Sequence, residues 1–136
     1  HGEHILVVDD IPEQRQIAAA MLEKLGYEVH TAASGEEAVA YMVLHQADLV
    51  ILDMIMDPGI DGLETYRQLL SLHPHQKAII ASGFSENARV RAAPAMGAGA
   101  YIRKPYTFEK IGQAVRTELE RPTAATGPPQ KGDPTA

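Results

Sequence analysis

The sequence predicts an α/β fold in which a doubly wound, five-stranded parallel sheet carries helices on both faces. Short apolar runs such as residues 5–8 and 49–52 are typical of strands that are buried on both sides. Segments with apolar residues at helical spacing follow these runs. The β-α unit repeats about five times, which predicts parallel strands joined by right-handed helical crossovers.

In the first half of the chain, the strand at 5–8 is followed by Pro12, which suits the first turn of a helix because its missing N–H is not needed there. A second strand is expected over residues 27–31. Ser34 and Glu37 have the spacing of a capping box and predict the start of the next helix. The first helix has its apolar residues at Ile17, Ala18, Met21, Leu22 and Leu25.

The second half of the chain continues the same alternation. The elements expected there are a strand at 49–53, a helix from Leu63 to Leu70, a strand at 78–81, a helix from Ser85 to about Ala93 that Pro94 interrupts, a strand at 100–102, and a helix capped by Thr107. In the last helix the residues expected to face inward are Ile111, Ala114, Val115 and Leu119.

Composition narrows the possible functions. The chain has 136 residues, 45% of them hydrophobic, a net charge of -6 and no cysteine. The acidic balance disfavours direct nucleic-acid binding, and the lack of thiols excludes disulfides and thiolate metal sites. No apolar run approaches the roughly 20 residues of a membrane helix, so a cytoplasmic domain without membrane contact is expected. We expect this domain to span residues 4–121 and residues 122–136, rich in Pro, Gly, Thr and Ala, to form a disordered tail or linker.

Polar residues with a common chemistry follow several of the expected strands. Asp9 and Asp10 follow the first, Asp53 ends the third, and Ser82 and Lys104 follow the last two. Ligands of open α/β sheets bind outside the carboxyl ends of the strands. Carboxylates crowded at that edge favour a cation such as Mg²⁺. A carboxylate nucleophile, a metal and a lysine are the parts of a phosphoryl-transfer site.

Five short motifs carry a resemblance to a known family: Val7-Val8-Asp9-Asp10, Ile51-Leu52-Asp53, Asp61-Gly62, Ala81-Ser82-Gly83 and Lys104-Pro105. In order and spacing they resemble the receiver domain of bacterial two-component response regulators. This resemblance implies the flavodoxin-like receiver fold and a phosphoryl group accepted on Asp53 from a kinase phosphohistidine.

The resemblance also implies a role for each matching residue. Asp9, Asp10, Asp53 and the backbone carbonyl of Ile55 would hold Mg²⁺. Lys104 would pair with the phosphoryl group. Ser82 and Tyr101 would form the switch. Further positions of the site are Met54, Gly83, Phe84 and Pro105, the last after a cis bond. Because Ile55 and Phe84 are bulky and apolar beside the path of attacking water, we expect slow self-dephosphorylation. Asp57 departs from the family pattern as an insertion. We interpret it as a change of loop length, in preference to an added acid near the metal or a reshaped partner surface.

The partners implied by the resemblance are a histidine kinase or a histidine phosphotransfer domain, together with an unknown downstream effector. The expected partner surface comprises the last two helices and the Tyr101 strand. The chain could be a stand-alone receiver or one cut from a larger protein, and we favour the receiver of a hybrid histidine kinase.

Three other functions are weighed against this one. A haloacid-dehalogenase-like phosphotransferase requires an acid two residues after the nucleophile, where this chain has Ile55. A flavin-binding module requires a phosphate loop after the first strand, where Asp9 and Asp10 would repel phosphate. A docking pseudo-receiver that is never phosphorylated would not need the acids and the lysine to be intact. A signalling phosphoacceptor, not a metabolic enzyme, is therefore expected.

Overall fold

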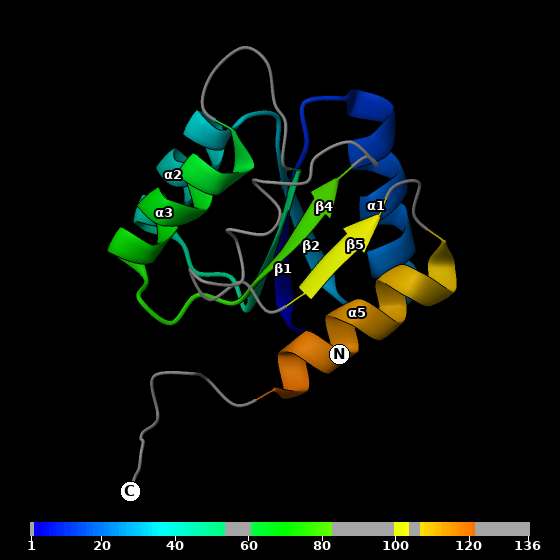
Figure 1. Ribbon diagram of the computed structural model, residues 1–136. Helices are drawn as coiled ribbons and strands as arrows, with labels where there is room; N and C mark the ends of the chain where they lie inside the picture. The colour runs from blue at the N-terminus through cyan, green and yellow to red at the C-terminus, as the bar shows by residue number, and fades with distance from the viewer. Residues whose placement is uncertain (1, 54–60, 83–99, 104–106, 122–136) are drawn as a thin grey trace, which may run out of the picture.

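The computed structural model describes residues 2–53, 61–82, 100–103 and 107–121, and it shows a parallel sheet between two layers of helices (Figure 1). The strands are β1 (His4–Val8), β2 (Glu28–Ala32), β3 (Leu49–Asp53), β4 (Ala78–Ser82) and β5 (Ala100–Arg103). The helices are α1 (Pro12–Lys24), α2 (Gly35–Leu44), α3 (Gly62–Leu72) and α5 (Phe108–Glu120).

The elements agree closely with those expected. The strand at 49–53 has the expected bounds, whereas β2 lies one residue later than the range 27–31. Pro12 is the first residue of α1. Ser34 caps α2, since its side chain accepts a hydrogen bond from the backbone N–H of Glu37 at 3.0 Å. The helix expected from Ser85 and its interruption at Pro94 lie outside the described residues.

Strand order decides which segments meet. In the sheet formed by the described residues the order is β2-β1-β3-β4-β5, and every neighbouring pair is parallel. Val8 of β1 is in register with Leu52 of β3, and Asp53 is in register with Ala81 of β4. The residues that follow β1 therefore lie beside the last residue of β3, at the carboxyl edge of the sheet.

The core is divided by the sheet into two clusters. Leu6 and Val8 pack with α2 and α3 on one face, and Ile5 and Val7 pack with α1 and α5 on the other. This alternation follows from the period of two along a strand. β1, β3 and β4 are buried on both faces, as their apolar runs predict, whereas the edge strand β2 is buried only at Ala32. In α1 the buried residues are Ala18 and Leu22, whereas Ile17 from the expected stripe is 49% exposed.

The end of α5 differs from the simple apolar pattern. Ala114 and Leu119 are only partly buried, and Glu118 is 1% exposed. Its carboxylate accepts hydrogen bonds from the Arg121 guanidinium, with the Nε bond at 3.1 Å. The ammonium group of Lys77 donates to the carbonyls of Leu119, at 2.9 Å, and Arg121. Ionic hydrogen bonds thus allow a carboxylate to be buried in the last turn.

Candidate functional site

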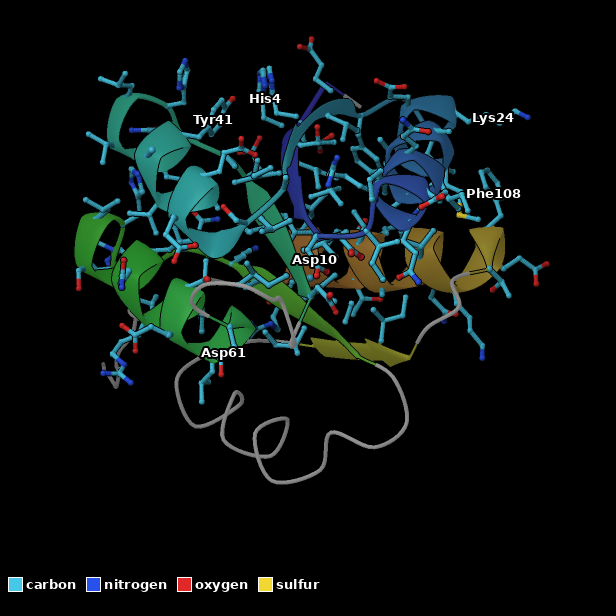
Figure 2. All side chains as sticks on the ribbon, turned by 90° about the horizontal axis from the view of Figure 1, so that it is seen from above. His4, Asp10, Lys24, Tyr41, Asp61 and Phe108 are labelled. Carbon is cyan, nitrogen blue, oxygen red and sulfur yellow. The ribbon has the colours of Figure 1, made fainter. Side chains whose placement is uncertain are left out.

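Three carboxylates converge at the carboxyl edge of the sheet. One oxygen from each of Asp9, Asp10 and Asp53 lies within 4.8 Å of the other two. Asp9 is 1% exposed, Asp53 is 5% exposed and Asp10 is half-buried. Figure 2 looks onto this edge and shows Asp10 between the two helical layers. The acids meet because β1 pairs directly with β3, which a pattern of apolar runs alone does not specify.

The turn that carries Asp9 and Asp10 is held by several hydrogen bonds. The backbone N–H of Asp9 donates to the carbonyl of Ala32 at 3.1 Å, which extends the pairing of β1 with β2. Oδ1 of Asp9 accepts from the backbone N–H of Ile11 at 3.0 Å. Nη1 of Arg15 donates to the backbone carbonyl of Asp9 at 2.7 Å. The two acids therefore sit on a constrained turn between β1 and α1.

The acid cluster fits a hard divalent cation. Carboxylate oxygens lie about 2.1 Å from bound Mg²⁺, so two of them on opposite sides of the ion are about 4.2 Å apart. The spacing of the three oxygens, within 4.8 Å, is close to this limit. No histidine belongs to the cluster, and the chain has no cysteine. An all-oxygen set of this kind suits Mg²⁺ better than zinc or copper.

The remaining predicted site residues are placed only in part. The backbone of β4 puts Ser82 one residue beyond Ala81, the partner of Asp53 in the sheet. Tyr101 lies in β5, in register with Ile80. The other residues of the prediction lie outside the described part of the chain: Met54, Ile55, Asp57, Gly83, Phe84, Lys104 and Pro105. Lys104 directly follows β5 in the sequence, and therefore follows a strand that ends at this edge.

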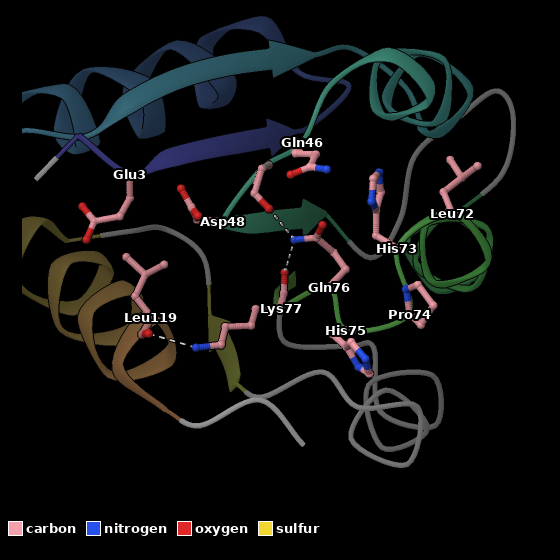
Figure 3. Close-up of a pocket in the computed structure, with 11 residues that line it drawn as sticks. Glu3, Gln46, Asp48, Leu72, His73, Pro74, His75, Gln76, Lys77 and Leu119 are labelled. Carbon is pink, nitrogen blue, oxygen red and sulfur yellow. Dashed lines mark hydrogen bonds between the residues drawn. The ribbon is translucent and has the colours of Figure 1, made fainter. Parts of the chain in front are cut away.

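A cavity of about 530 Å³ lies at the opposite, amino edge of the sheet (Figure 3). Glu3, Asp48 and Gln76 line it, and none of the predicted site residues does. The Gln76 amide is already engaged, because its Nε2 donates to the carbonyls of Ala47 and Lys77. The convergent acids lie at the other edge, so this cavity is not part of the candidate site.

Sequence reasoning missed two features of the site. It assigned no role to Arg15, although a basic residue six positions after the first acid could have suggested a contact back to the turn. It also did not predict that the backbone N–H of Ile11 would donate a hydrogen bond to the Asp9 carboxylate. Both contacts depend on how the chain turns between β1 and α1, and turns of this kind have no strong periodic pattern.

A parallel sheet in this order, with an acid pair after β1 and an acid ending β3, is the arrangement that the receiver resemblance implied. The family model of the response regulator receiver domain matches residues 5–116. The chain belongs to the response regulator receiver domain family. Its solved structural neighbours have the same fold. One is a CheY-like receiver domain protein from Methanospirillum hungatei, with a TM-score of 0.82 and 28% identity over 88% of this chain and 95% of that one.

Similar proteins are found among both short and long chains. The sensor kinase CckA of Brucella abortus is 34% identical over 119 residues, which cover 86% of this chain but 12% of CckA. The sporulation initiation phosphotransferase F of Bacillus subtilis is 31% identical over 118 residues, 87% of this chain and 94% of that protein. The chemotaxis protein CheY of Thermotoga maritima is 30% identical over 84% of this chain and 95% of its own length.

Family membership establishes the general function. The chain is a receiver domain of two-component phosphorelay signalling, a class of phosphoacceptors that interact with histidine kinases or phosphotransfer proteins. Receiver domains hold Mg²⁺ through acidic residues, and the three acids are compatible with this. Among the described residues, no helix is both long and apolar enough to cross a membrane.

Proposed function

We propose that Asp53 accepts a phosphoryl group from the phosphohistidine of a histidine kinase or a histidine phosphotransfer domain, in a reaction that depends on Mg²⁺. The observation that carries this proposal is the meeting of Asp9, Asp10 and Asp53 within 4.8 Å. Two acids are suited to hold the cation, and the third is suited to react. Asp53 is the acid at the end of the central strand β3, with strands on both sides.

The proposed transfer is a simple displacement. A carboxylate oxygen of Asp53 attacks the phosphorus of the phosphohistidine, a new O–P bond forms and the N–P bond breaks. The electron pair of the broken bond stays on the imidazole nitrogen, which takes up a proton. Bound Mg²⁺ supplies charge neutralisation for the phosphoryl oxygens. The protein residues keep the reacting carboxylate in place, since Asp53 is 95% buried and lies on a rigid strand.

The remaining roles are proposed from the family resemblance. The backbone carbonyl of Ile55 adds a metal ligand, and Lys104 pairs with a phosphoryl oxygen. Ser82 moves toward the phosphoryl group and Tyr101 turns inward behind it, which changes the surface around β5 and α5 for a downstream effector. The position of Ser82 at the end of β4, beside β3, supports its part in this proposal.

The lifetime of the phosphoryl group is proposed to be long, because the family resemblance puts the bulky apolar residues Ile55 and Phe84 beside the path of attacking water. Replacing both with small polar residues should shorten the half-life measured by loss of label after the donor is removed. An unchanged half-life would show that these two positions do not control hydrolysis in this chain.

The central test is phosphorylation by acetyl phosphate with Mg²⁺, followed by intact-mass spectrometry. The wild type should gain one phosphoryl group, and Asp53→Asn should gain none. Asp48→Asn is the matched control, since Asp48 precedes the same strand at its other end, where its carboxylate accepts from the His4 N–H at 2.8 Å. This control should be labelled like the wild type. Failure of the wild type to take up the group would instead favour the docking pseudo-receiver.

A further inference from the structure

Arg15 makes a contact that ties α1 to the acid turn. It lies near the start of α1, is half-buried, and its Nη1 donates to the backbone carbonyl of Asp9 at 2.7 Å. A short bond from a charged donor belongs to the stronger class of hydrogen bonds in proteins. The acceptor is the main chain between the two predicted metal-binding acids, so the contact bears on their position.

The start of α1 has no side-chain cap, because the capping position is occupied by Ile11. The turn is closed by other means. The Asp9 carboxylate accepts from the Ile11 N–H at 3.0 Å, and the Arg15 backbone N–H donates to the Ile11 carbonyl at 3.0 Å. The Arg15 side chain then reaches back to the Asp9 carbonyl. Side-chain and main-chain bonds therefore join the turn and the helix into one unit.

We propose that Arg15 is a positioning residue of the magnesium site. Its guanidinium fixes the Asp9 carbonyl, and this keeps the carboxylates of Asp9 and Asp10 directed toward Asp53. The proposal rests on the proposed function of the acid cluster and names one more residue on which that cluster depends. Arg15 acts through the backbone of Asp9, as outer-sphere partners of metal ligands do.

Two effects of removing Arg15 have opposite signs, which makes the proposal testable. Removing a positive charge from the turn that carries Asp9 and Asp10 would by itself strengthen cation binding. Losing the bond to the Asp9 carbonyl would loosen the turn and weaken cation binding. Loss of an outer-sphere partner typically lowers metal affinity by about 10- to 100-fold. We therefore expect Arg15→Met to bind Mg²⁺ at least about tenfold more weakly than the wild type.

The experiment is calorimetric titration of the full chain with Mg²⁺ in the absence of any phosphodonor. The variants are Arg15→Met and Arg15→Lys, with Arg67→Met as the matched control. Arg67 is an exposed arginine of α3 that pairs with Glu64 at 2.9 Å. The control should bind Mg²⁺ like the wild type. Arg15→Lys keeps the positive charge but lacks the planar guanidinium group, so we expect its Mg²⁺ affinity to lie between those of the wild type and Arg15→Met.

Equal or tighter Mg²⁺ binding by a folded Arg15→Met would overturn the proposal, because Arg15 would then affect cation binding through its charge alone. If circular dichroism shows that Arg15→Met does not fold, Arg15→Lys decides: weaker binding supports the proposal and unchanged binding overturns it. Absence of Mg²⁺ binding by the wild type, or equal phosphorylation of the wild type and Asp53→Asn, would refute the proposed function itself. The two failures are therefore distinguishable.

Discussion

Asp10→Asn should make the metal-free protein more stable, although it removes a proposed ligand. The substitution keeps the shape of the side chain and removes one of three negative charges. Oxygens of Asp9, Asp10 and Asp53 lie within 4.8 Å of each other. In the unfolded chain Asp53 is far from the other two, so most of this repulsion opposes folding.

The size of the effect follows from the distances. At 4.8 Å, with an effective dielectric constant of about 20, two unit charges repel by about 3.5 kcal/mol. Asp10→Asn removes two such pairs, but the pair with the adjacent Asp9 is also present in the unfolded chain, so only the pair with Asp53 counts in full. Nearby positive charge, including the guanidinium of Arg15, offsets part of this repulsion, and salt screens the half-buried Asp10. We therefore expect a net gain of about 1–3 kcal/mol in the free energy of unfolding.

Addition of Mg²⁺ should reverse the order of stability. Free ligand at 100 times its dissociation constant stabilises the folded state by about 2.7 kcal/mol, and the wild type should gain this while Asp10→Asn gains much less. The assay is urea unfolding followed by circular dichroism, in EDTA and in saturating Mg²⁺. If Asp10→Asn is less stable in EDTA, or if both proteins gain equally from Mg²⁺, the repulsion argument is wrong.

Three further predictions concern stability. Burial raises the pKa of Tyr66 to about 12 from the ordinary value of 10.0. Its contribution to the free energy of unfolding is therefore complete below about pH 10 and is lost as pH rises toward 12. In a pH series of urea titrations, the free energy of unfolding of Tyr66→Phe should fall less steeply over this range than that of the wild type. Asp61 caps α3 by accepting from the Glu64 N–H at 2.9 Å, so Asp61→Ala should cost about 1 kcal/mol in urea unfolding while Asp61→Asn stays near the wild type; equal losses would exclude the cap. Lys77 donates to two carbonyls at the end of α5, so Lys77→Met should cost about 1–2 kcal/mol and speed amide hydrogen exchange in the last turn; unchanged exchange there would contradict this role.

The elements of the fold were largely predictable because their patterns are local. The bounds of β3 followed from a run of apolar residues ending at Asp53, and the start of α1 followed from Pro12. The wrong expectations about these elements concerned single residues within a correctly placed helix. Ile17 has helical spacing but is 49% exposed, whereas Ala18 and Leu22 are the buried residues of α1.

The candidate site was predictable to the extent that its residues follow strands. Asp9, Asp10 and Asp53 were expected at one edge from the parallel topology, and the structure brings them together. Their roles in metal binding and phosphoryl transfer remain predictions. The Arg15 contact could not be predicted, because a side chain that reaches a backbone carbonyl leaves no pattern of spacing.

The amino-acid sequence by itself determined the alternation of strands and helices, the two-sided burial of β1, β3 and β4 and the presence of acids at the ends of β1 and β3. These properties depend on neighbouring residues and on the periods of strand and helix. Only the tertiary structure decided that β1 lies beside β3 and that Asp9 and Asp53, 44 positions apart in the chain, share one site. Strand order follows from the packing of helices on both faces, and this is a property of the whole domain.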